Sequence, residues 1–313
     1  MNKPLTKSSA APHLALMAVQ IMFGTWPIVG KVALKALPSV ALVAFRVAGA
    51  ALAFIVIGAI TGRVGRIAKR DWPLLIASSL LGVVLNQWLF VKGLSLTSVI
   101  NATLLGTTIP IFTLMVSIAL RMDRPSFRRA LGIFLAAAGV VYLIGPSRAG
   151  FSSGTRLGDL LLVTNSICYG TYIAISKDLM KRYSALTVIT WIFVVGSVAT
   201  VPAGLISLSH VSVASINPAI WLWIVYIILV PTVGAYYLNT WALGRVPPST
   251  VAVYIYLQPL IAFSLAPLLL GERLSWGTLI AALLVFAGVL VVTRRGRSRA
   301  IKEVSEHPEA FGH

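Results

Sequence analysis

Residues 101–143 read NATLLGTTIPIFTLMVSIALRMDRPSFRRALGIFLAAAGVVYL, and residues 250–292 read TVAVYIYLQPLIAFSLAPLLLGERLSWGTLIAALLVFAGVLVV. The two stretches lie 149 positions apart and align without a gap, so that Pro110 falls on Pro259 and DRPSF (123–127) falls on ERLSW (272–276). Each copy consists of an apolar run with a proline at the same place, an acid-Arg-x-Ser-aromatic hinge, and a second apolar run ending in Ala-Gly. The repeated unit is therefore two hydrophobic helices joined by a short charged turn, and such a unit belongs in a membrane.

The composition agrees with this reading. Of 313 residues, 58% are hydrophobic and only 11% are charged, and the mean hydropathy is +0.91. Soluble proteins carry about 25% charged residues, so this chain has too few charges to cover a surface that faces water. We expect an all-α membrane protein whose surroundings are the lipid bilayer. The retained apolar run after Lys3 and Lys7 is read as a first helix and not as a cleaved signal peptide.

Ten membrane-spanning helices are predicted. Their ranges are about 13–36, 39–61, 72–92, 98–120, 128–146, 157–178, 185–207, 219–243, 249–270 and 276–293. The chain divides into a cytoplasmic N-terminus (1–12), a first five-helix repeat (13–146), a periplasmic linker (147–156), a second five-helix repeat (157–293) and a disordered cytoplasmic tail (294–313).

The opening helices repeat as well, at an offset of 146. The triplet Gly24-Thr25-Trp26 matches Gly170-Thr171-Tyr172, and Lys31 matches Lys177. Because each half has an odd number of helices, the second half enters the membrane from the opposite side. Two inverted repeats of this kind are typical of secondary transporters.

The distribution of basic residues predicts the orientation. With the N-terminus inside, 19 of the 26 Lys and Arg residues lie in inner segments and 6 lie in outer segments, while Arg46 lies within a helix. Short cytoplasmic loops carry the excess of positive charge. Both termini are therefore predicted to be cytoplasmic. This topology also accounts for the net charge of +18, so we do not expect nucleic acid as a partner.

Several motifs resemble one known family. The stretches GTWPIVGK (24–31), AFRVAGA (44–50), NATLLGTTIPIF (101–112) and YIYLQPLIAFSLAPLLLGERLSW (254–276), with the two AGV endings, are similar to the EamA family of the drug/metabolite transporter superfamily. The resemblance covers about residues 13–293. It implies a multi-pass exporter or facilitator in the bacterial inner membrane, with a central cavity between the halves. Amino acids and other small metabolites are the implied substrates.

Polar side chains inside apolar spans are the candidate site, since a bilayer offers no water to satisfy them. Twelve candidate substrate-binding residues are Tyr254, Gln258, Tyr256, Trp26, Asn86, Gln87, Asn101, Tyr169, Tyr172, Tyr237, Asn239 and Arg46. The same spans contribute further polar residues that could touch a substrate: Gln20, Thr25, Thr107, Thr108, Asn165 and Tyr236. Tyr254 and Gln258 share a helix face while Tyr256 points elsewhere. Both could line a pathway or hydrogen-bond between helices. Amides and aromatics without carboxylates suit a zwitterionic or aromatic solute.

Arg46 is the charge that lies clearly inside a span, about 10 Å from its outer end at about 1.5 Å per residue. It could attract a substrate carboxylate, lock a gate by bonding carbonyls, or extend to the outer headgroups. Lys31 and Lys177 lie at helix ends and are expected to anchor there. Small residues on helical spacing, from Gly132 to Gly139 and from Ala281 to Gly288, are expected to let two helices pack closely.

No catalytic motif or metal site is evident, so we expect neither an enzyme nor a cofactor. Cys168 is the single cysteine, and none of the four histidines lies deep in a span. All eight acids lie in loops, at helix ends or in the tail, and tyrosine has an ordinary pKa of about 10. Proton coupling therefore lacks a suitable carrier, with Asp159 as the exception if water reaches it. We expect facilitated export by alternating access, in a monomer or weak homodimer. The alternative is a sugar-phosphate, nucleotide-sugar or lipid-type carrier of the same superfamily.

Overall fold

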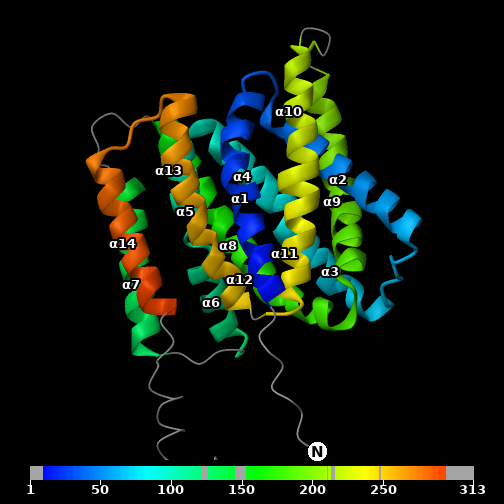
Figure 1. Cartoon of the computed structure of the whole chain (residues 1–313), viewed down its shortest axis with the longest axis horizontal. Helices are drawn as coiled ribbons and strands as arrows, with labels where there is room; N and C mark the ends of the chain where they lie inside the picture. Colours follow the sequence, from blue (N-terminus) through cyan, green and yellow to red (C-terminus); the bar gives the residue numbers. More distant parts are fainter. Residues whose placement is uncertain are drawn as a thin grey trace, which may run out of the picture.

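The structure is a computed structural model that describes residues 10–121, 126–144, 153–209, 211–212, 216–246 and 248–293. Within these ranges all regular structure is helical (Figure 1). Hinge residues 122–125 and the predicted tail 294–313 lie outside the described residues.

The first half forms a bundle in which two of the predicted spans are built from shorter helices in line. Its elements are α1 (Ala10–Ala33), α2 (Ser39–Thr61), η1 (Lys69–Asp71), α3 (Trp72–Ser79), η2 (Leu80–Val84), α4 (Leu85–Leu96), α5 (Val99–Gly106), α6 (Ile109–Ala119) and α7 (Phe127–Ile144). The turn η2 is π-helical and joins α3 to α4. The α5–α6 break falls directly before Pro110, which has no N–H to continue a helix.

The second half follows the same pattern. Its elements are α8 (Ser153–Arg182), α9 (Ala185–Leu208), α10 (Pro218–Ile228), η4 (Leu229–Gly234), α11 (Ala235–Leu243), α12 (Pro248–Val253), η5 (Tyr254–Tyr256), α13 (Leu257–Leu270) and α14 (Trp276–Thr293). The π-helical turn η4 begins 149 positions after η2, and the 3-10 turn η5 precedes Pro259 as the other break precedes Pro110. The irregular turns therefore occur at equivalent places of the two repeats. Below, a residue and its equivalent in the other half are called repeat mates.

This is a multi-pass membrane protein. Seven helical segments of the described residues are long and apolar enough to cross a bilayer. Shorter apolar helices cover Ala130–Leu143 and Trp276–Gly288. The remaining long helix, α8, has 30 residues and carries charges at both ends.

Small residues let the helices pack closely, as the sequence predicts. The α7–α14 pair lies at one side of the bundle and the α2–α9 pair at the other (Figure 1). A Cβ on Gly139 would come within 3.0 Å of the Ala281 carbonyl, and a Cβ on Gly288 within 2.5 Å of the Gly132 carbonyl. Since Gly139 and Gly288 are repeat mates, α7 and α14 contact each other through equivalent surfaces across a pseudo-two-fold axis.

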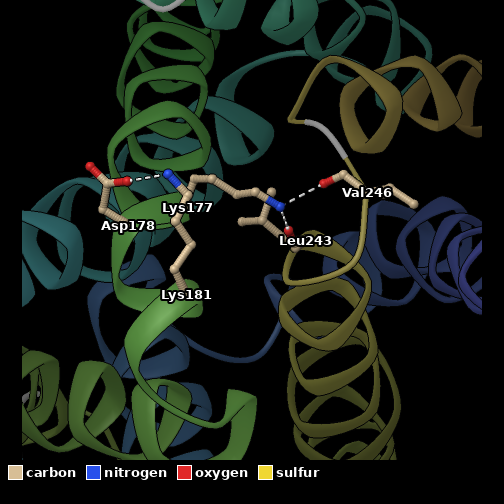
Figure 2. A network of polar contacts seen from close by, with 5 residues as sticks. All are labelled: Lys177, Asp178, Lys181, Leu243 and Val246. Carbon is tan, nitrogen blue, oxygen red and sulfur yellow. Dashed lines mark hydrogen bonds and ion pairs between the residues drawn. The ribbon is translucent and has the colours of Figure 1, made fainter. Parts of the chain in front are cut away.

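Two lysines fasten helices together in a way that the sequence did not predict. The ammonium of Lys177 in α8 donates to the carbonyls of Leu243 (2.5 Å) and Val246 (2.9 Å) at the end of α11 (Figure 2). Its mate Lys31 in α1 donates to the carbonyls of Leu94 (2.7 Å) and Thr97 at the end of α4. A cation is favourable at a helix C-terminus, where carbonyls lack helical partners. The two lysines thus bond to helix ends and not only to the membrane surface.

Candidate functional site

A buried arginine lies at the centre of the bundle. Arg46 in α2 is 1% exposed, so it does not extend to the headgroups. Its Nη1 donates to Gln87 Oε1 at 2.5 Å, its Nε donates to Thr232 Oγ1 at 3.2 Å, and its guanidinium lies 3.7 Å from the centre of the Trp26 ring. These partners are neutral side chains. They are not the backbone carbonyls to which Arg46 would bond if it locked a gate. No described carboxylate forms an ion pair with Arg46.

A directed chain of hydrogen bonds continues from Arg46 across the two repeats. Gln87 Nε2 donates to the Tyr236 hydroxyl (2.9 Å), which donates to Asn86 Oδ1 (3.0 Å). The Asn86 amide then donates to Asn165 Oδ1 at 2.8 Å. Gln87, Tyr236 and Asn86 each accept one of these bonds and donate the next, as a satisfied buried network requires. We call Arg46, Gln87, Tyr236, Asn86, Asn165, Thr232 and Trp26 the central network.

The central network lies on the pseudo-two-fold axis. Gln87 and Tyr236 are repeat mates, 149 positions apart, and they bond directly to each other. Two equivalent residues can touch only close to the axis that relates them. Secondary transporters built from inverted repeats hold their substrates at such an interface, near the middle of the membrane.

The π-helical turns shape this region. In η4, the Thr232 hydroxyl donates to the Ile227 carbonyl at 2.6 Å and accepts from Arg46. Pro231 lacks an N–H, which helps to widen the turn at that point. In η2, a Cβ on Gly82 would lie 2.5 Å from the Tyr172 ring, so the ring packs directly on the backbone. Such turns are frequent at functional sites.

Aromatic and amide groups of the second repeat adjoin the network. The Asn239 amide donates to the Tyr169 hydroxyl at 3.3 Å, and the Tyr169 and Tyr172 rings lie 5.5 Å apart. Tyr169 follows Asn165 by one helical turn of α8. The structure therefore brings together seven of the twelve predicted residues: Trp26, Arg46, Asn86, Gln87, Tyr169, Tyr172 and Asn239.

Two of the three predicted residues of η5 and α13 pair with α1 instead. The Gln258 amide donates to Gln20 Oε1 at 2.7 Å, and the Tyr254 hydroxyl lies 2.8 Å from His13 Nδ1. Tyr256 points elsewhere, as predicted, and its ring lies 6.2 Å from that of Phe286. Gln258 and Tyr254 are partly buried, so a role in a pathway remains a prediction for them.

Asn101 and Tyr237 lie away from the central network. Asn101 is at the start of α5 and is 3.4 Å from Asp159 Oδ2. Tyr237 lines a cavity of about 910 Å3 between the ends of α2, α8 and α11. This cavity lies at the N-terminal end of the bundle, the end at which α1 begins (Figure 1).

A smaller cavity of about 350 Å3 lies at the distal end, where α1 ends and α2 begins. Four of its residues, Ser39, Val40, Trp88 and Lys92, are repeat mates of Ala185, Leu186, Tyr237 and Trp241, which line the larger cavity. The two cavities are thus equivalent in the repeat and unequal in size. Of these two cavities, the one at the N-terminal end has the larger volume.

The twelve-residue set leaves out three members of the network, of which the sequence analysis names Tyr236 and Asn165 as further polar residues and does not name Thr232. Tyr236 and Asn165 are 3% exposed and are central, although the twelve-residue set includes Tyr237 in place of Tyr236. Thr232 is 0% exposed and bonds to Arg46. The available signal was that Tyr236 is the mate of Gln87. Among the described residues, no group of three His, Cys, Asp or Glu side chains could hold a metal ion.

An inverted pair of helical repeats with a polar centre is typical of multi-pass transport proteins. The chain belongs to the EamA-like transporter family, whose model matches residues 11–145 and 156–294. It is 27% identical over 226 residues to an uncharacterized transporter of Archaeoglobus fulgidus, covering 72% of this chain and 77% of that protein. It is 24% identical to the uncharacterized transporter YetK of Bacillus subtilis, with 92% and 88% covered. It is 23% identical to the WAT1-related protein At3g18200 of Arabidopsis thaliana, with 99% and 89% covered.

A solved structure shares the fold. A crystal structure of a protein 20% identical to this chain superposes with a TM-score of 0.65 and covers 92% of this chain and 98% of its own. The chain is therefore a transporter of the EamA type within the drug/metabolite transporter superfamily.

Proposed function

We propose that this protein is a secondary transporter that moves an amino acid or a related zwitterion out of the cell. Ten spans in two inverted repeats would alternate access to the central network, and the protein would act as a carrier and not as an enzyme. The excess of basic residues in alternate loops supports an orientation with both termini in the cytoplasm, and the EamA family supports a location in a bacterial inner membrane. On this orientation, the N-terminal end and its larger cavity face the cytoplasm.

Arg46 carries the proposal. A charge buried in a membrane protein is costly and is retained where it pairs or functions. The guanidinium has five N–H groups, of which the structure assigns two to described side chains, and both acceptors are neutral. A solute with a carboxylate would supply the missing negative charge in a fork geometry that arginine favours. The other polar groups of the solute would form hydrogen bonds with Asn86, Asn165, Tyr169 and Asn239.

Facilitated movement is the mode that we propose. The central network contains no carboxylate and no histidine, so its groups offer no carrier for a proton near neutral pH. The solute would then flow down its own gradient, which suits the release of an accumulated metabolite.

The test is counterflow in proteoliposomes that contain the purified full chain. Labelled amino acids, purines and sugar phosphates are compared, each with and without an imposed pH gradient. We expect exchange of an amino acid at equal rates in both conditions. Exchange of sugar phosphates alone would favour the alternative carrier, and uphill accumulation driven by the pH gradient would contradict facilitation. A cysteine at Ser153 should react from outside with an impermeant reagent; reaction only in broken cells would reverse the orientation.

A further inference from the structure

Two carboxylates of the second repeat bond to one turn of the first repeat at the distal end. Glu272, in the loop after α13, accepts from the backbone N–H groups of Val99 (2.8 Å) and Ile100 (3.1 Å), one on each oxygen. These N–H groups belong to the first turn of α5, where donors lack helical partners and negative charge is favourable.

Asp159 of α8 reaches the same turn from another side. Its Oδ1 accepts from the Thr97 hydroxyl at 2.7 Å, and the Asn101 amide lies 3.5 Å and 3.4 Å from its two oxygens. Asp159 is 0% exposed. We call Asp159, Glu272 and the turn 97–101 the distal clasp, since it joins the two repeats at this end.

Two of these bonds cannot form at the N-terminal end. The repeat mates of Thr97 and Val99 are Val246, which has no hydroxyl, and Pro248, which has no N–H. The mate of Asp159 is His13, whose ring nitrogen bonds to Tyr254. Among the described residues, the bonds that Thr97 and Val99 make in the clasp therefore have no equivalent at the N-terminal end.

The contacts that the two ends share cannot favour either end. Lys177 donates to two carbonyls at the end of α11 (Figure 2), and Lys31 makes the equivalent pair of bonds to the end of α4. The two cavities differ in size, with about 350 Å3 at the end with the clasp and about 910 Å3 at the other end. This difference matches the clasp, which differs between the ends, and not the lysine bonds, which are present at both.

We propose that the distal clasp is a gate that holds the distal end closed at rest, so that substrate loads from the N-terminal end. The inference rests on the proposed function for its direction: with the N-terminus in the cytoplasm, the resting protein is poised for export. Asp159 and Glu272 are then positioning residues, which act on the access of substrate and do not touch it.

Single-cysteine accessibility tests the gate without any substrate. In a Cys168→Ala background, the reporter Ala102→Cys lies in α5 directly after the clasp turn and is 0% exposed. The variant Val99→Pro copies the repeat mate and removes one donor to Glu272. It keeps the helix, because proline is tolerated at the first helical position and Ser98 before it is extended.

We expect the reaction rate of Ala102→Cys with a soluble maleimide to rise on the order of tenfold in Val99→Pro, as for loss of one hydrogen bond to a charged group. Thr97→Val, which also copies its mate and changes no backbone group, should act likewise through Asp159. A second reporter, Ala185→Cys in the larger cavity, should react more slowly as the distal end opens.

The matched control is Asp178→Asn, which removes an exposed acid paired with Lys181 and should leave both reporters unchanged. Reporter rates in Val99→Pro and Thr97→Val that equal those of the control, at unchanged melting temperature, would overturn the gate. Faster reaction at both reporters would indicate loosening of the whole bundle and would also overturn it. Because no substrate is used, either result leaves the transport assay to judge the proposed function separately.

Discussion

Replacing Arg46 by Gln should reduce transport strongly while leaving the protein folded. The substitution removes the guanidinium that bonds to Gln87 and Thr232 and stacks on Trp26. A charge-assisted hydrogen bond to a substrate carboxylate contributes about 1.5–3 kcal/mol. At about 1.4 kcal/mol per factor of ten, we expect the half-saturating substrate concentration to rise about 10- to 100-fold. The lost internal bonds are offset because no charge is buried any longer, so abundance should stay near that of the wild type.

The assay is counterflow in proteoliposomes with a transported amino acid and with its carboxamide, which lacks the anionic charge. Arg46→Gln should weaken transport of the acid and leave the amide nearly unaffected. Arg46→Lys is the matched control, since it keeps a point charge but loses the planar fork and the ring stacking. Its transport of the acid should lie between that of the wild type and that of Arg46→Gln. An equal effect of Arg46→Gln on acid and amide would refute a carboxylate partner. So would unimpaired transport of the acid.

Three further predictions concern other parts of the bundle. Gln258→Ala should cut transport at constant abundance if the residue lines the pathway; parallel loss of abundance would show that it only holds α13 on α1. Lys31→Met and Lys177→Met should each lose about 0.3–1 kcal/mol from a helix C-terminus, seen as a drop in melting temperature, and an unchanged melting temperature in either variant would contradict this role. Gly288→Ala should lower the melting temperature through about 1–3 kcal/mol of overpacking against the α7 backbone, whereas Gly106→Ala, which has open space, should not.

Local patterns predicted the parts of this fold that depend on local chemistry. The hinge and the proline before it predicted the repeat register, because proline has no N–H to continue a helix, and the structure has breaks before Pro110 and Pro259. Glycines at helical spacing predicted the close packing at Gly139 and Gly288. Spacing also predicted that Tyr254 and Gln258 share a face, and both do bond to α1.

The centre of the site was harder to predict, because it depends on which distant helices meet. Arg46 has a side chain long enough to reach either the headgroups or the interior, so its burial depends on partners from α4 and η4. Helical spacing in the sequence also does not tell which of Tyr236 and Tyr237 faces the centre of the bundle. A π-helical turn directly precedes them, and its wider turn changes the phase of every residue that follows, so a period of 3.6 residues no longer gives the inward face.

Departures from the repeat point to function more sharply than the repeat itself. Features that obey it, such as Lys31 and Lys177 or the two π-helical turns, act equally on both ends of the bundle. They cannot distinguish inside from outside, nor recognise a solute that lacks two-fold symmetry. Arg46 breaks the repeat, since its mate is Ile192, and it places one charge beside an axis where Gln87 already meets its own mate. The distal clasp breaks it again at one end only. Recognition and direction must arise from such differences, so substitutions that restore the repeat at these places are the variants most informative about both.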